Sequence, residues 1–286
     1  MKHSSFGASD GRLVVYFHGA PGGIGEAQIL HADATQHGLR VICQDRFAIE
    51  KSIVDERYFQ MLADDIKSLA QGAQVDIIGF SIGAFVALQV SRLMRAHVRS
   101  LHLISPAAPL EGGDFLKSMA GRKVFWLARN MPLAFKLLSY WQGLLAALAP
   151  KLLYGMLFSS AVAGDKELAA STNFIKFLCP VLRECFCGNV PGYLRDVQAY
   201  VLPWQASLQK IWVKTQLWHG DQDNWSPKEM SEYLQQQIPH CVEVHRMQGL
   251  SHYSTLYAAA PRICRQLQSA QHHAIETRAP QENIKK

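Results

Sequence analysis

One tight turn, in which a serine stands between two glycines, constrains this sequence more than any other feature. Ser81 is at its centre, with Gly79 two residues before it and Gly83 two residues after it. The β-branched residues of 75–78 favour a buried strand, and the alanine- and leucine-rich residues 84–90 favour a helix. A Cβ at either glycine would collide with the neighbouring strand or helix in so sharp a turn. The pattern therefore predicts that the hydroxyl of Ser81 projects above the edge of a sheet.

Short apolar runs alternate with helical stretches on both sides of this turn. We predict strands at residues 13–17, 39–43, 75–78, 98–104, 214–218 and 241–245,. We predict helices at residues 26–37, 58–70, 84–90, 227–236 and 253–268,. Strands that alternate with helices imply parallel pairing and right-handed crossovers. The predicted fold class is therefore α/β, with a mostly parallel sheet.

One long segment, residues 114–206, breaks this alternation. It is helical in pattern and rich in leucine and aromatic residues, and it contains no β-rich run of strand length. We interpret it as a helical cap inserted into the α/β core. The predicted division is a first core part at 1–113, the cap at 114–206, a second core part at 207–270 and a polar tail at 271–286.

Composition excludes several classes of function. The 286 residues are 49% apolar and 18% charged, as in an ordinary globular protein,. The net charge of +6 is not gathered in a basic stripe interleaved with aromatic residues, so we expect no nucleic-acid partner,. The six cysteines do not have the spacing of a zinc site, and no phosphate-binding loop is present,. We therefore expect neither a metal nor a cofactor.

Since the N-terminus lacks the apolar run of a secretory signal, we expect reduced thiols and a cytoplasmic location.

Two further residues are positioned to act together with Ser81. A serine hydroxyl becomes nucleophilic when a base takes its proton, and that base needs a carboxylate to orient it. Chemistry in an open parallel sheet gathers at the carboxyl ends of the strands. Asp223 and His252 each follow a predicted strand, in the order serine, acid, histidine that is typical of the strand–turn–helix nucleophile,. Asp221 competes for the acid position, and His245 is a weaker candidate because it falls inside a predicted strand.

Four short motifs stand at or just after the ends of predicted strands. They are His-Gly-Ala-Pro-Gly at residues 18–22, Gly-Phe-Ser-Ile-Gly at 79–83, Gly-Asp-Gln-Asp at 220–223 and Gly-Leu-Ser-His at 249–252. With these motifs the chain resembles an α/β-hydrolase-fold serine hydrolase of the esterase, lipase or thioesterase type, with a helical cap. The resemblance covers residues 12–112 and 212–268, whereas the cap resembles no family.

The resemblance also implies roles for individual residues. The family spacing Gly-x-x-Asp-x-x-x-Pro selects Asp223 over Asp221 as the acid. The backbone amides of Ala20 and Ile82 would form the oxyanion hole, in which each donor contributes roughly 3 kcal/mol. His18, in the same loop as Ala20, would be structural.

The N-terminus departs from the family pattern. Such proteins usually have a β-hairpin before the strand predicted here at 13–17, and residues 1–12 are too few for a full hairpin. We therefore expect that one or two N-terminal edge strands are missing.

The cap carries most of the positive charge of the chain. Residues 114–206 contain ten Lys and Arg against five Asp and Glu, a difference of +5 out of a total of +6. Apolar helices with basic flanks fit an acyl-binding cap or peripheral contact with an anionic membrane. The alternative is an ordinary cap core with solvated lysines.

The expected function is cleavage of a carboxylic ester or thioester with an apolar acyl group, through an acyl-enzyme intermediate. The expected partner is a small-molecule ester or acyl substrate. A carbon–carbon bond hydrolase or an acyltransferase with the same triad is an alternative. A non-catalytic ligand-binding protein on the same scaffold is another.

Overall fold

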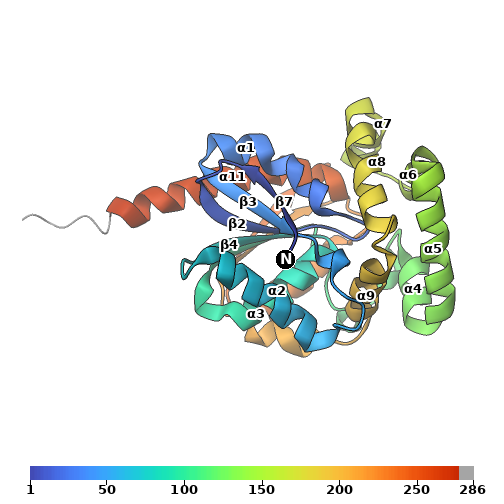
Figure 1. Cartoon of the computed structure of the whole chain (residues 1–286), viewed down its shortest axis with the longest axis horizontal. Coiled ribbons are helices and arrows are strands. Elements are labelled where there is room, and N and C mark those ends of the chain that lie inside the picture. Colours follow the sequence, from blue (N-terminus) through green and yellow to red (C-terminus); the bar gives the residue numbers. More distant parts are fainter. Residues whose placement is uncertain (277–286) are drawn as a thin grey trace, which may run out of the picture.

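A seven-stranded sheet forms the centre of the protein in the computed structural model, which describes residues 1–276, with side chains as far as residue 269 (Figure 1). The strand order is β1-β3-β2-β4-β5-β6-β7. Neighbouring strands run parallel, except that β1 pairs antiparallel with β3. The strands are β1 (His3–Gly7), β2 (Arg12–Phe17), β3 (Leu39–Gln44), β4 (Val75–Phe80), β5 (Val98–Ile104), β6 (Thr215–Gly220) and β7 (Cys241–Met247).

Helices cover both faces of the sheet. Helices α1 and α11 lie on one face, and α2 and α3 lie on the other (Figure 1). The core helices are α1 (His31–Gln36), α2 (Asp55–Ala70), α3 (Ile82–Met94), α10 (Lys228–Gln237) and α11 (His252–Glu276). Short 3-10 helices connect the elements: η1 (Ile24–Leu30), η2 (Arg46–Ala48), η3 (Arg95–His97), η4 (Leu110–Gly112), η5 (Phe115–Lys117) and η6 (Gln205–Lys210). The arrangement is the predicted α/β fold with a mostly parallel sheet.

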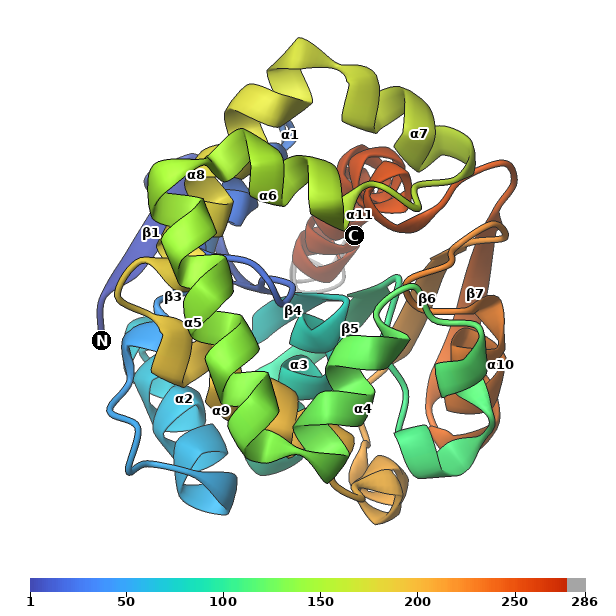
Figure 2. The same ribbon diagram turned by 90° about the vertical axis from the view of Figure 1, so that its right-hand side faces the viewer.

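Between β5 and β6 the chain forms helices and no strand. These helices gather at one end of the sheet, on the right of Figure 1 and towards the viewer in Figure 2. They are α4 (Arg122–Asn130), α5 (Pro132–Leu148), α6 (Pro150–Leu157), α7 (Ala163–Ala170), α8 (Thr172–Phe186) and α9 (Val190–Val201). No helix in the described part of the chain combines the length and the apolar character that crossing a membrane requires.

Most predicted elements agree with the structure to within four residues at each end, and two helices differ further. The helix expected at 26–37 begins as the 3-10 helix η1 and becomes α-helical only at His31. The tighter winding coincides with the inward turn of Glu26, whose carboxylate bonds to β2 and to the loop after it. The last helix continues past residue 268 to Glu276, so the start of the expected polar tail is helical. The rest of that tail, residues 277–286, lies outside the described residues.

The N-terminal edge of the sheet holds one strand of the expected hairpin. Residues 3–7 form β1, which pairs with β3 from His3 opposite Gln44 to Gly7 opposite Arg40. Residues 1–12 thus supply a single antiparallel strand rather than the full hairpin.

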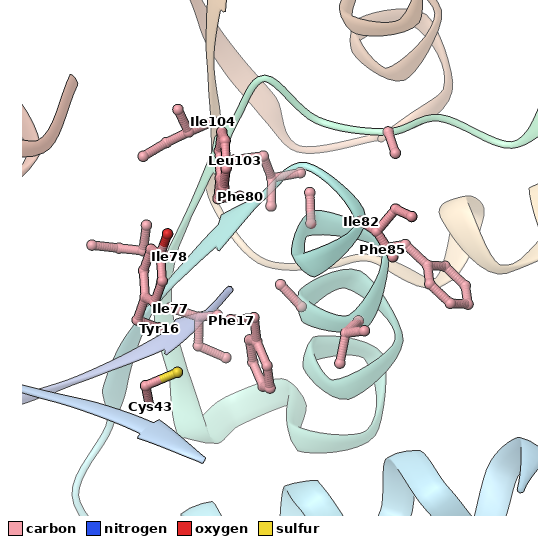
Figure 3. Close-up of a cluster of buried hydrophobic side chains, with 14 of the residues drawn as sticks. Tyr16, Phe17, Cys43, Ile77, Ile78, Phe80, Ile82, Phe85, Leu103 and Ile104 are labelled. Carbon is pink, nitrogen blue, oxygen red and sulfur yellow. The ribbon is translucent and has the colours of Figure 1, made fainter. Parts of the chain in front are cut away.

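An apolar cluster around β4 and α3 fixes the turn between them (Figure 3). All six residues of β4 are buried, as a central strand covered on both faces requires,. The labelled members of the cluster are Tyr16, Phe17, Cys43, Ile77, Ile78, Phe80, Ile82, Phe85, Leu103 and Ile104. The packing on both sides of Ser81 leaves the turn little freedom.

Candidate active site

The turn at Ser81 has the sharp geometry that the sequence predicts. Ser81 adopts φ 57° and ψ −126°, a conformation that non-glycine residues rarely take,. A Cβ at Gly83 would lie 2.1 Å from the carbonyl oxygen of Phe17, and one at Gly79 would lie 2.8 Å from the Cα of Ala84. Glycine is therefore required at both positions, because β2 and α3 approach the turn too closely for a side chain.

A cavity of about 490 Å³ lies between this turn and the cap. Ala20, Ser81 and Ile82 line it from the core. Apolar side chains of α4, α5 and α6 line it from the cap, among them Val124, Phe125, Leu138, Trp141, Leu153 and Met156. Its size and apolar lining are typical of a small-molecule site.

Two backbone amides beside the cavity have no hydrogen-bond partner among the described residues. Ile82 is the first residue of α3, so its N–H lies ahead of the hydrogen-bond ladder of the helix,. The N–H of Ala20 makes no hydrogen bond within the described residues. Both residues border the cavity, and the positive end of the α3 dipole lies at the same place,. The site can therefore offer donors to a negatively charged oxygen.

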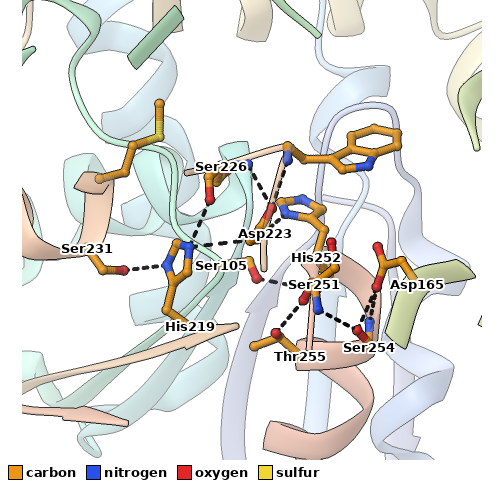
Figure 4. A network of polar contacts seen from close by, with 12 residues as sticks. Ser105, Asp165, His219, Asp223, Ser226, Ser231, Ser251, His252, Ser254 and Thr255 are labelled. Atoms are coloured by element: carbon orange, nitrogen blue, oxygen red, sulfur yellow. Dashed lines mark hydrogen bonds and ion pairs between the residues drawn. The ribbon is translucent and has the colours of Figure 1, made fainter. Parts of the chain in front are cut away.

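Asp223 and His252 form a buried pair next to this cavity (Figure 4). The Nδ1–H of His252 donates to Oδ2 of Asp223 at 2.8 Å. The other carboxylate oxygen accepts the N–H groups of Trp225 and Ser226 at 2.8 and 2.9 Å. Burial by itself would raise the pKa of Asp223, but the charge and hydrogen bond of His252 outweigh it and hold that pKa below its ordinary value,. The carboxylate is therefore ionised and orients the imidazole ring.

The turn at Ser81 lies beside this pair through the packing of its neighbour, Phe80. The rings of Phe80, its neighbour, and His252 lie 4.8 Å apart between centroids. Trp225 also stacks on the His252 ring, with centroids 5.5 Å apart, and lines the same cavity as Ser81. Among the described residues the hydroxyl of Ser81 has no hydrogen bond to His252. Such bonds are commonly long in the absence of substrate.

The competing candidates lie elsewhere. Asp221 accepts the N–H of Gly249 at 2.8 Å. His245 stacks on Trp218 with centroids 3.7 Å apart, on the last strand of the sheet. His18 is buried, and burial, reinforced by the charge of Arg46, lowers its pKa well below the ordinary value, so this ring stays neutral. Of the candidates, the structure joins only Asp223 and His252.

His219, which the sequence analysis did not single out, supports the loop of Asp223. Its Nε2–H donates to the carbonyl oxygen of Ser226 at 2.8 Å, and its Nδ1 accepts the hydroxyl of Ser231 (Figure 4). Burial lowers the pKa of His219, so it holds the loop as a neutral ring. The only sequence signal was its place at the end of β6, beside the acid motif.

Asp165 of the cap also escaped the sequence analysis. Its buried carboxylate accepts the N–H of Ser254 at 2.7 Å and the N–H of Tyr253 at 3.1 Å. The hydroxyl of Ser254 donates to the same group at 2.7 Å. Tyr253 and Ser254 directly follow His252 in the first turn of α11. Asp165, from the inserted helical segment, therefore satisfies the free N–H groups at the start of the helix that carries the histidine. Nothing in the local sequence links Asp165 to that helix, because 87 residues separate it from His252.

The loop that carries Ala20 is held on two sides by buried ionisable groups. Glu26 accepts the N–H of Gly19 at 2.8 Å. Arg46 donates to the carbonyl oxygen of His18 at 2.9 Å and pairs with Asp196 of the cap helix α9 at 2.7 Å. Core and cap thus meet in an ion pair directly behind this loop.

Solved structures show the same fold at low sequence identity. An esterase of Thermogutta terrifontis has a TM-score of 0.66 and 15% identity, over 95% of this chain and 93% of that one. An α/β-hydrolase fold protein of Nakamurella multipartita has a TM-score of 0.63 and 18% identity, over 93% of each chain. An enol-lactonase of Burkholderia xenovorans LB400 has a TM-score of 0.62 and 11% identity, over 93% of this chain and 94% of that one. The chain therefore has the α/β-hydrolase fold.

A comparison with curated proteins finds no significant match. A family model described as lipid-droplet associated hydrolase matches residues 44–254, more than half of the chain. The matched range includes Ser81, Asp223 and His252, and it runs through the cap at 114–206, which resembled no family by its motifs. The chain belongs to the lipid-droplet associated hydrolase family.

Proposed function

We propose that the protein is a serine hydrolase that cleaves a carboxylic ester or thioester with an apolar acyl group. The observation that carries the proposal is the ionised, buried Asp223 bonded to His252, packed beside the strained Ser81 turn at an apolar cavity. A scaffold that only bound ligands would have no need for this arrangement of acid and base.

The mechanism follows from the geometry. The Oγ of Ser81 attacks the carbonyl carbon of the substrate while Nε2 of His252 takes the hydroxyl proton. Asp223 stabilises the imidazolium, and the N–H groups of Ala20 and Ile82 donate to the developing oxyanion. His252 then gives its proton to the leaving alcohol or thiol as the acyl-enzyme forms. Water, deprotonated by the same ring, attacks the acyl-enzyme and releases the acid and the free serine.

The lining of the cavity and the description of the family support a lipid-like ester as substrate. Most of the side chains that the cap contributes to the cavity are apolar, so the binding of a long acyl chain there would remove apolar surface from water,. We place the reaction at a lipid surface on the cytoplasmic side. All six cysteines are free, and this supports a reducing location,.

The test is hydrolysis of p-nitrophenyl esters of increasing acyl length. Ser81→Ala should lower kcat/KM by at least about 1,000-fold, since removal of the nucleophile of such a triad has an effect of this size or larger. Ser159→Ala is the matched control, because Ser159 also borders the cavity but has no role in the mechanism. Folded Ser81→Ala protein that still hydrolyses the esters would refute the proposal.

A further inference from the structure

The outward face of α5 is largely apolar, and two polar side chains of this helix point inward. Six large side chains of α5 are exposed: Leu133, Leu137, Tyr140, Trp141, Leu144 and Leu148, at 78%, 73%, 49%, 45%, 56% and 77%. Ser139 and Gln142, by contrast, are buried. A helix that lies between a core and water carries mainly polar side chains on its outward face, but the outward face of α5 has a single charged residue, Lys136,. The outward face therefore fits an apolar surrounding.

The apolar surface extends to the two helices beside α5. Exposed side chains continue it on α4, on α6 and in the turn between α4 and α5: Trp126, Met131, Leu152 and Met156. Figure 2 shows α4, α5 and α6 together in front of the sheet. We call this surface the α4–α6 face. So many exposed apolar side chains on three neighbouring helices are uncommon on a monomeric soluble protein and indicate an interaction site,.

Charge indicates what the face contacts. Between Asp114 and Asp165 the sequence has no acidic residue, but it has Lys117, Arg122, Lys123, Arg129, Lys136 and Lys151, all exposed. A second copy of the chain would bring the same positive charges against each other. An anionic lipid surface would neutralise them, and Trp126, Tyr140 and Trp141 are residue types enriched at membrane interfaces.

The candidate active site opens at the same face. Trp141 of α5 and Met156 of α6 are 45% and 46% exposed, and both also line the cavity that contains Ser81. A substrate in a lipid layer against this face would meet the cavity without first crossing water.

We propose that the α4–α6 face docks on a phospholipid surface that carries anionic headgroups. The leucines of α5 insert below the headgroups, the surrounding lysines and arginines contact the phosphates, and the cavity receives its substrate from the lipid. The delivery of substrate rests on the proposed hydrolase function, whereas the docking does not.

The experiment measures binding of the full-length protein to sedimented phosphatidylcholine vesicles with and without phosphatidylserine. The wild type should bind the vesicles with phosphatidylserine, and salt should weaken this binding because it screens the charges. The double variant L137S/L144S should bind at least about tenfold less, because two inserted leucines are lost. Trp212→Ser is the matched control, since Trp212 is 63% exposed but lies before the amino end of β6, away from the cap.

Activity separates docking from catalysis. Leu137 and Leu144 do not line the cavity, so L137S/L144S should hydrolyse a short soluble ester at the wild-type rate and lose activity only on esters in vesicles. Full vesicle binding without any hydrolysis would remove the proposed function but leave the docking proposal in place.

Three results would overturn docking: no vesicle binding by the wild type, equal binding by L137S/L144S, or a wild-type dimer that this variant dissociates. Quenching of wild-type tryptophan fluorescence by brominated phosphatidylcholine reports on Trp126 and Trp141 independently of any variant. Absence of quenching would also contradict the proposal.

Discussion

Glu26 is a carboxyl group in the interior of the protein, beneath the loop that carries Ala20. Its Oε1 accepts the hydroxyl of Tyr16 and the N–H of Gly19, both at 2.8 Å. Its Oε2 has no partner among the described residues. Burial raises the pKa of Glu26 to about 7,. The folded protein therefore holds a proton that the unfolded chain releases near pH 4.5.

This difference predicts how stability depends on pH. The contribution of Glu26 is complete below about pH 4.5 and is lost as the pH rises through about 7, because the folded state then buries a charge. Glu26→Gln keeps an acceptor oxygen and does not titrate. From pH 5 to 8 the wild type should lose about 2 to 3 kcal/mol of unfolding free energy relative to Glu26→Gln. Urea unfolding of both proteins at the two pH values measures these free energies. If the wild type and Glu26→Gln differed by the same unfolding free energy at both pH values, the raised pKa of Glu26 would be contradicted.

The candidate site residues that could be predicted from the sequence share a local signal, their position after a strand. Ser81, Asp223 and His252 each follow a strand, and the carboxyl ends of parallel strands meet at one edge, so strand prediction alone brings them near each other. Arg46 and Asp196 have no such signal. They are 150 residues apart and pair only after the cap has folded onto the core.

At the scale of elements, α7 of the cap and α11 of the core act as one unit. The carboxylate of Asp165 accepts N–H groups at the start of α11, where a helix has donors without partners,. The N–H of Gly164 also donates to the carbonyl oxygen of Gly249, just before that start. A shift of α7 would therefore move His252.

Asp165→Asn tests this connection. The amide has one acceptor oxygen where the carboxylate has two. One N–H group at the start of α11 should therefore lose its acceptor, and His252 should no longer be held in a fixed position. We expect kcat on a soluble ester to fall about 10- to 100-fold with little change in KM, because misplacement of a catalytic group has effects of this order. Glu167→Gln, an exposed change on the same helix, is the control. A purely structural role would lower the melting temperature but leave kcat of the folded protein unchanged.

Helices and strands could be predicted accurately only where the sequence marks their ends. The strand at 98–104 matches β5 residue for residue, because Ser105 and Pro106 end its apolar run sharply,. The cap was predicted as a helical region without bounds for its helices. The leucines of α5 face outward, so the alternation of apolar and polar positions that defines a water-facing helix is absent,.

At the scale of the whole molecule, the cap and the core form one site from two surfaces. The buried pair of Arg46 and Asp196 joins them, and α9 fits closely enough that a Cβ at Gly192 would lie 2.1 Å from the carbonyl oxygen of Phe47. The cavity lies between the two parts, and the apolar face of the cap lies outside it. Trp141 and Met156 belong to both, so the proposed docking face and the cavity at Ser81 share residues of α5 and α6.

We propose Ser81 as the nucleophile of this molecule. Reaction with an alkyl fluorophosphonate, followed by peptide mass spectrometry, tests it most directly, because the probe phosphonylates an activated serine without requiring knowledge of the substrate. We predict one adduct, on the peptide that contains Ser81, and a much slower reaction in His252→Gln, which lacks the base. An adduct on a different residue, or no adduct on the folded wild type, would contradict the account.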